Sequence, residues 1–225
     1  DYECVGIDAS SQAIRLARRL HPDIRFIHGQ APRDLGPLID RAQLVVLSDV
    51  LEHVADDFQL LSELLAAAAP GTFFLLTVPA DLALWSQHDR AFGHYRRYDR
   101  QRLVQLWSGL PVSAPLVSYY NARLYPLVRM VRSWNQWRGG TRGVAGTDFQ
   151  LPPEWINNLL IRAFRGEQHR LVRLATGQSN RPYGHGVSLM ALLERLPGTI
   201  EPRVKPVDVA CDVHDPAAEL VTSGA

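Results

Sequence analysis

Short apolar runs without polar alternation recur along the chain, and such runs predict strands buried on both faces of a parallel sheet. Two of them are continuous, at residues 44–47 (LVVL) and 72–78 (TFFLLTV). Weaker strand candidates lie at residues 2–8, 24–28, 116–120 and 187–192. Apolar residues between the strands recur at helical spacing, for example at positions 58, 61 and 65. This order predicts an α/β fold with a Rossmann-like, doubly wound and mainly parallel sheet.

The second half of the chain carries longer helical patterns. Residues 121–137 predict an amphipathic basic helix, residues 139–150 a flexible loop, and residues 154–164 a helix that continues towards Leu174. The last 30 residues are rich in Pro, Asp and small residues and show no periodicity. We therefore expect a core over 1–114, a strand and helical insert over 115–182, the closing strand of the core over 183–195, and a loosely ordered tail over 196–225.

Polar side chains follow two of the predicted strands at the point where each strand ends. Ser48, Asp49, Glu52 and His53 come directly after the apolar run 44–47, and open α/β sheets bind ligands outside the carboxyl ends of their strands. Asp8 ends the first predicted strand, where a carboxylate can accept hydrogen bonds from two ribose hydroxyls. The alternative is that Asp8 only caps the following helix.

A dense polar segment follows the strand predicted at 72–78. Residues 88–98 (HDRAFGHYRRY) include His88, Asp89 and His94 together with several arginines and tyrosines. Such density on a loop after a strand favours a binding role, although the arginines could be plain surface charge. His88 and His94 could hold a metal with Asp89, but their spacing matches no closed zinc pattern, so we expect no metal site.

Three motifs carry a family resemblance. The segments VGIDAS at 5–10, SDVLEHV at 48–54 and HDRAFGHYRRY at 88–98 resemble class I S-adenosylmethionine-dependent methyltransferases, in a subgroup that acts on small molecules. The resemblance implies S-adenosylmethionine as cofactor and an acceptor such as a glycan or lipid precursor. It also implies a set of cofactor-binding residues, which are Asp8, Ala9, Gln30, Ala31, Ser48 and Asp49. Gln30 stands where relatives usually have an acid, and its amide can still donate to and accept from an adenine edge.

The same resemblance suggests which residues serve the acceptor. His53, His88 and His94 are the candidates for the catalytic base, because imidazole transfers protons near neutral pH. Tyr95, Arg96 and Arg97 are the candidates for binding the acceptor.

The Gly-rich loop that is the family's most specific motif does not occur, because the chain begins at what reads as the second strand. The resemblance, which covers residues 2–195, therefore suggests a fragment that lacks the first strand. In the family's strand order, 3-2-1-4-5-7-6, that strand is central. We expect either an open slot between residues 4–7 and 44–47 or direct pairing of these two strands, and we favour the slot.

The amino-acid composition limits the kinds of binding partner that we expect. Among 225 residues, 24 Lys and Arg against 23 Asp and Glu leave a formal net charge of +1, which gives no global field to attract nucleic acid, so we expect no such partner. Cys4 and Cys211 lie far apart in the sequence, and a reducing cytoplasm is the default location. The basic helix at 121–137 could lie on a membrane surface or pack as an ordinary helix.

Two other functions stay open. A dinucleotide or nucleotide-sugar enzyme would need a Gly-rich turn and a Tyr-Lys or similar pair, and the chain has a single lysine, Lys205. A non-catalytic Rossmann-like binding module, or an inactive fragment, would use the basic aromatic helix to contact a membrane or partner.

Overall fold

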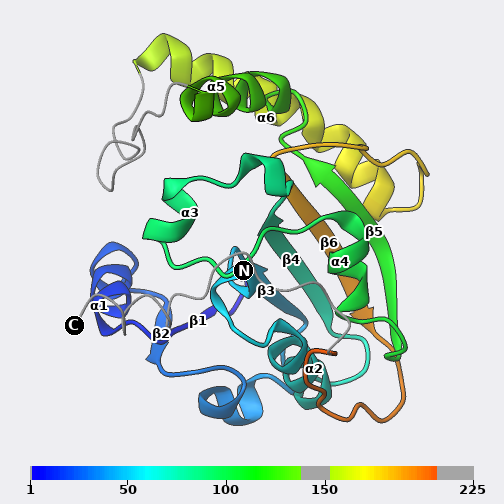
Figure 1. Cartoon of the computed structure of the whole chain (residues 1–225). Coiled ribbons are helices and arrows are strands. Elements are labelled where there is room, and N and C mark those ends of the chain that lie inside the picture. The colour runs from blue at the N-terminus through cyan, green and yellow to red at the C-terminus, as the bar shows by residue number, and fades with distance from the viewer. Residues whose placement is uncertain (1, 138–152, 207–225) are drawn as a thin grey trace, which may run out of the picture.

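The computed structural model describes residues 2–137 and 153–206, in which the strands form two hydrogen-bonded sheets (Figure 1). The first sheet pairs β1 (Val5–Asp8) with β2 (Arg25–His28). The second has the order β3-β4-β6-β5, and its strands are β3 (Leu44–Ser48), β4 (Phe73–Pro79), β6 (Ser188–Arg195) and β5 (Val112–Tyr120).

The strands run mainly in one direction. β1 is parallel to β2, and β3 is parallel to β4. β6 is antiparallel to both β4 and β5, so β5 points the same way as β3 and β4. The predicted α/β, Rossmann-like and mainly parallel sheet is confirmed, and its closing strand is the reversed one.

No ladder of hydrogen bonds joins β1 to β3 within the described residues. Of the two arrangements expected from the sequence, direct pairing is therefore not found. The sequence also predicted that residues 44–47 would be buried on both faces, and this is wrong. Leu44 and Val46 are 52% and 55% exposed, because β3 ends its sheet and no described element covers the face that carries them.

Short helices cover the sheets. They are α1 (Ser11–Leu20), α2 (Asp57–Ala67), α3 (Gln87–Ala91) and α4 (Arg100–Gln105), with 3-10 turns at Arg33–Leu38, Leu51–His53 and Leu82–Leu84. Ser10 caps α1, since its Oγ accepts a hydrogen bond from the N–H of Ala13. Asp56 caps α2 in the same way through the N–H of Gln59.

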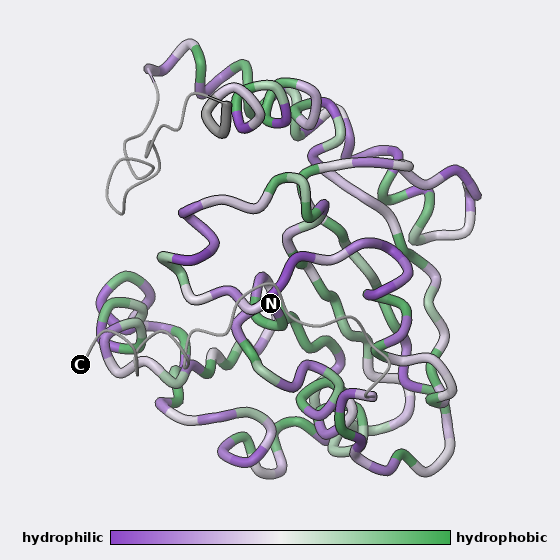
Figure 2. The backbone as a smooth tube through the Cα atoms, in the orientation of Figure 1, coloured by the Kyte–Doolittle hydropathy of each residue, from purple (hydrophilic) through white to green (hydrophobic). Residues whose placement is uncertain are grey.

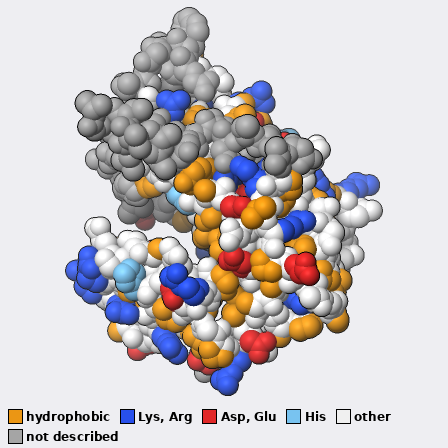
Figure 3. All heavy atoms as spheres, turned by 60° about the horizontal axis from the view of Figure 1, so that its bottom comes forward, with side chains coloured by type: hydrophobic (Ala, Val, Ile, Leu, Met, Phe, Trp, Pro, Cys, Tyr) orange, Lys and Arg blue, Asp and Glu red, His pale blue; other side chains and the backbone are white. Residues whose placement is uncertain are grey.

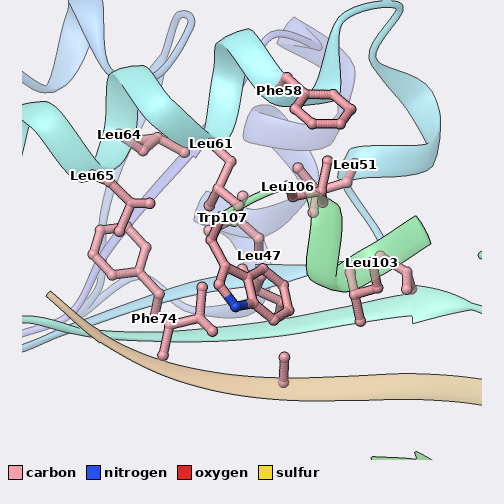
Figure 4. Packing of buried hydrophobic residues seen from close by; sticks show 14 of the residues in the cluster. Leu47, Leu51, Phe58, Leu61, Leu64, Leu65, Phe74, Leu103, Leu106 and Trp107 are labelled. Carbon is pink, nitrogen blue, oxygen red and sulfur yellow. The ribbon is translucent and has the colours of Figure 1, made fainter. Parts of the chain in front are cut away.

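The core lies between α2 and the four-stranded sheet (Figure 4). Leu61 and Leu65 of α2 point towards Leu47 of β3 and Phe74 of β4, and Trp107 fills the space beside them (Figure 4). All five side chains are buried. Burying a large apolar side chain stabilises the fold by about 1.5–3 kcal/mol, so this cluster fixes the strand end that follows Leu47.

Two long helices form the insert predicted before the last strand. These are α5 (Tyr125–Trp137) and α6 (Glu154–Ala175), which lie together at the top of Figure 1, and α6 contacts β5. Both helices mix apolar and polar residues along their length (Figure 2). The flexible loop predicted at 139–150 lies outside the described residues.

The first part of the predicted loose tail is packed on the domain. Ile200 is buried, and Arg203 donates hydrogen bonds to the carbonyl oxygens of Gln105, Leu106 and Ser108. Sequence periodicity missed these contacts because one buried side chain and one arginine suffice to anchor an extended segment. Residues 207–225 lie outside the described part of the chain.

On the face drawn in Figure 3, acidic and basic side chains are mixed among apolar ones, and neither charge forms a large patch. Of the helices that the structure describes, none has the length and hydropathy to cross a membrane.

Candidate functional site

The carboxyl ends of β1 and β2 present Asp8 and the segment from His28 to Ala31 side by side, with Asp8 in register with His28. Asp8 is exposed, and its Oδ1 accepts a hydrogen bond from the N–H of Ser10 at 2.6 Å. Asp8 thus does hold the turn into α1. This contact uses one carboxylate oxygen, and the carboxylate as a whole keeps acceptor capacity for a hydroxyl group.

A second loop fixes the backbone of Gln30. Its N–H donates to Oδ2 of Asp34 at 2.7 Å, and the pKa of Asp34 is lowered by the hydrogen bond from Arg33 and by this contact. Asp34 also explains Gly29, because a Cβ there would lie 2.6 Å from the same Oδ2 atom. The backbone beside Ala31 is therefore held in place while the Gln30 side chain stays exposed.

The end of β3 holds Ser48 and Asp49 against β4. Asp49 Oδ2 lies 3.4 Å from both Ser48 Oγ and Thr77 Oγ1, and the Asp49 N–H donates to the Thr77 carbonyl at 2.9 Å. The φ of Asp49 is 52°, a left-handed conformation that costs energy for a residue with a side chain. Strain of this kind gathers at ligand sites, where surrounding contacts enforce it.

Glu52 is the least satisfied group of the site. It is 0% exposed, and neither of its carboxylate oxygens has a hydrogen-bond partner within the described residues. Burial raises its pKa to about 8, Asp49 adds to the rise, and Arg97 and Arg96 oppose it. Glu52 therefore keeps a proton at neutral pH unless a positive charge comes close.

His53 and His94 meet in front of Glu52. Their rings form an edge-to-face pair with centroids 4.5 Å apart and planes at 86°. Burial and the neighbouring His94 lower the pKa of His53, which favours the neutral imidazole. His94 is buried, and its Nδ1 lies 3.1 Å from Asp89 Oδ1. Because the carboxylate accepts this bond, Nδ1 carries the hydrogen, and in the neutral form of the ring the lone pair is on Nε2.

Asp89 is the anchor of this region. Its Oδ2 accepts from the N–H of Ser86 at 2.8 Å and from the Ser86 hydroxyl at 3.0 Å. Its Oδ1 accepts from Arg97 Nε at 2.8 Å. Burial alone would raise the pKa of Asp89, but His94, Arg97 and Ser86 outweigh it and hold that pKa well below the ordinary value. Asp89 is therefore a fixed negative charge that orients His94.

Arg96 and Arg97 are buried, so the alternative of plain surface charge does not apply to them. Arg96 donates to the carbonyl oxygens of Leu51, Val54 and Ala55, and thereby holds the turn that carries Glu52 and His53. Arg97 also donates to the carbonyl of Ala80 at 3.0 Å. Direct contact of these two side chains with an acceptor stays a prediction.

Tyr95 and His88 are the other two residues that the sequence suggested for the acceptor. The Tyr95 N–H donates to the Glu52 carbonyl at 2.8 Å, which ties the polar segment to the turn after β3. His88 lies on α3, with its ring 4.4 Å from that of Phe92. It is not a member of the Glu52, His53 and His94 group, whose ligand atoms all lie within 4.8 Å of one another.

Sequence reasoning missed three residues here. Glu52 was within the quoted motif but received no role. Asp57 accepts from the Tyr98 hydroxyl and from Arg102, both at 2.7 Å, and so joins α2 to the polar segment. Tyr120 ends β5, and burial raises its pKa, to which Asp49 and Glu52 also contribute. Only its position at a strand end could have drawn attention to it.

The family model described as a methyltransferase domain (Methyltransf_23) matches residues 1–125. The chain matches no curated protein.

Solved structures with similar folds have low sequence identity. The plantazolicin methyltransferase BpumL, in complex with a triazolic desmethylPZN analog and SAH, is 13% identical with a TM-score of 0.49, over 87% of this chain and 68% of that one. A putative methyltransferase from Bacillus halodurans C-125 is 12% identical with a TM-score of 0.48, over 86% and 83%. A Haloferax volcanii putative methyltransferase in complex with the Trm112 activator is 12% identical with a TM-score of 0.48, over 86% and 72%. Likenesses at this level add nothing about activity.

Proposed function

The chain belongs to the methyltransferase domain family, with S-adenosylmethionine as its methyl donor, and from this premise we propose that it methylates a small-molecule acceptor such as a glycan or lipid precursor. The observations that carry the proposal are the positions of Asp8, Gln30 and Asp49 at or just after the carboxyl ends of β1, β2 and β3, and the contact between the rings of His53 and His94. One side thus suits a nucleoside, and the other suits proton transfer.

The residues fit the adenosine part of the cofactor. Asp8 offers carboxylate oxygens for ribose hydroxyls, and the exposed amide of Gln30 can pair with an adenine edge. Ala9 and Ala31 directly follow these two residues in the sequence, and Ser48 and Asp49 lie at the end of β3. The cofactor supplies an electrophilic methyl group on a sulfonium.

The task of the chain's own residues is to align the acceptor and to manage its proton. His53 and His94 are suited to this task because one is exposed and neutral and the other is oriented by Asp89. The polar segment that carries His94 also carries His88, Tyr95, Arg96 and Arg97, and we propose that this group faces the acceptor.

The overall proposal is tested by two measurements on the purified protein. Calorimetry should show binding of S-adenosylhomocysteine, the demethylated product. Incubation with methyl-labelled S-adenosylmethionine and a small-molecule extract should then move the label into an extractable product. Binding without any transfer would favour the non-catalytic binding module, and absence of binding would overturn the proposal.

Asp8→Ala should weaken binding of S-adenosylhomocysteine about tenfold or more, because losing a hydrogen bond to a charged group costs roughly 1.5–3 kcal/mol. Ser10→Ala is the matched control, since it removes the other cap of the same turn without touching the carboxylate. Calorimetry on both variants separates the two roles of Asp8. Equal losses of affinity in both would reduce Asp8 to a helix cap.

We further propose a cytoplasmic protein whose segment 121–137 touches an anionic membrane surface. The exposed apolar residues Leu127, Met130, Val131 and Trp134 recur at helical spacing on α5, and the segment carries arginines but no acidic residue.

Met130→Glu should reduce co-flotation with phosphatidylglycerol vesicles several-fold, because it places a charge of the same sign as the lipid on the contact face. Leu16→Glu, on the exposed surface of α1, is the matched control and should change nothing. Equal flotation of both variants would exclude this segment as the contact.

A further inference from the structure

We propose that Glu52, His53 and His94 form a binding site for a divalent first-row transition-metal ion of the zinc class. Two imidazoles and one carboxylate come from two separate segments, the turn Leu51–His53 and the loop after α3. Within the described part of the chain, their ligand atoms all lie within 4.8 Å of one another. Two histidines and one glutamate are also the protein ligands of open catalytic zinc sites.

The unpaired carboxylate is the independent observation that points to a ligand. Glu52 is fully buried, and both of its oxygens lack a hydrogen-bond partner among the described residues. Leaving a buried polar group unsatisfied destabilises the fold, and a charged group does so more strongly. A cation bound at this carboxylate would remove that cost, because buried charges are tolerated when they are paired or coordinate a metal.

The contact between His94 and Asp89 orients the His94 ring for metal coordination. Metal-bound histidines usually donate their other ring N–H to a carboxylate, which fixes the ring and its tautomer. His94 does this through Nδ1 to Asp89, so its Nε2 is available to a metal. Asp89 is in turn held by Ser86 and Arg97, and the orientation of the ring is therefore set before any metal arrives.

His53 can move to complete the coordination, and its exposure gives the metal ion access from solvent. A tetrahedral metal about 2.1 Å from each ligand atom places any two of them about 3.4 Å apart. The ligand atoms, which lie within 4.8 Å of one another, therefore have to close by up to roughly 1.4 Å, and the exposed ring of His53 can move in this way. The exposure of His53 also gives the ion a path from solvent, and an open coordination position remains for a further ligand.

From the sequence we expected no metal site, because His88, His94 and Asp89 were taken together as the candidate ligands and match no closed zinc pattern. The structure separates these roles, since Asp89 binds the Nδ1 of His94 and Glu52 takes the place of a carboxylate ligand. Only the tertiary structure brings the turn after β3 next to the loop after α3 and so forms the site.

The catalytic use of this ion rests on the proposed function. A bound divalent metal lowers the pKa of a hydroxyl group that it holds. With His53 and His94 bound to the ion in place of acting as the base, the acceptor would lose its proton to solvent. Its oxygen would form a bond to the methyl carbon, and the carbon–sulfur bond would break with its electron pair on sulfur. The products are the O-methylated acceptor, S-adenosylhomocysteine and one proton, and the ion is unchanged.

The test is metal binding by the purified protein after stripping with EDTA. Titration with Zn²⁺ by calorimetry should show one equivalent bound, and Co²⁺ should give an absorption spectrum with imidazole ligation. Glu52→Gln and His53→Gln should each weaken Zn²⁺ affinity at least about 10–100-fold, as the loss of even an outer-shell partner does elsewhere. His169→Gln and Glu201→Gln, both exposed and outside the cluster, are the matched controls and should bind normally.

Each result decides one question. Circular dichroism and S-adenosylhomocysteine binding show whether a variant is folded. If Glu52→Gln does not fold, His53→Gln is the variant that tests the metal site. Wild-type protein that binds no Zn²⁺, or folded variants that bind it as tightly as the controls do, would overturn the metal site. Methyl transfer that persists in EDTA would overturn its catalytic use while leaving the proposed function intact. Zinc binding without any methyl transfer would uphold the site and overturn the proposed function.

Discussion

Asp89→Asn is expected to lower the free energy of unfolding by about 3–5 kcal/mol, because removing one partner of a buried ion pair leaves the other charge uncompensated. Arg97 would lose its ionic partner, and the amide cannot match the acceptor capacity of the carboxylate that Ser86 and His94 now share. Urea denaturation followed by circular dichroism measures the change. Asp23→Asn, at an exposed aspartate, is the control and should stay within about 0.5 kcal/mol of the wild type.

The pH dependence of this difference has a defined sign. The pKa of Asp89 is lower in the folded state than the value of about 3.9 expected in the unfolded chain. Its contribution to stability is therefore fully present above about pH 4 and declines as the pH falls through the lower folded-state pKa. The gap between wild type and Asp89→Asn should narrow in acid. A gap that widens below pH 4 would show that Asp89 is not the fixed anion described above.

His94→Ala is expected to reduce methyl transfer by about 10²–10⁴-fold, the usual contribution of a group that manages a proton in the transition state. The affinity for S-adenosylhomocysteine should stay within about twofold of the wild type, since His94 lies on the acceptor side. Label transfer and calorimetry on the same preparation give the two values. His169→Gln is the control for the loss of a histidine as such. Normal turnover with weakened cofactor binding would contradict the assignment.

The expected effects of the Asp89 and His94 substitutions also separate structure from catalysis. Asp89 touches Arg97, Ser86 and His94, so its loss should affect both stability and turnover. His94 contributes less to stability, so the midpoint of urea denaturation of His94→Ala should be closer to that of the wild type. A large loss of stability in His94→Ala would mean that its effect on turnover reports misfolding.

Local pattern was sufficient for the elements of the first half of the chain. The carboxyl ends of the strands that finish at Asp8, His28 and Ser48 were predicted to within one residue. Strand and helix periodicity and helix caps depend on neighbours within a few positions, so the sequence contains the information directly. The strand-end rule then located Asp8, Ser48 and Asp49 at the sheet edge without coordinates.

The tertiary structure alone decided which polar side chains are buried and which of them meet. Glu52 and His94 are 42 positions apart, and their contact depends on Arg96, whose guanidinium reaches back to the carbonyls after β3. The same holds for Leu44 and Val46, whose apolar run predicted burial and whose exposure follows from the position of β3 at the edge of its sheet. Burial and long-range contacts depend on what packs against a residue, and a local pattern does not contain that partner.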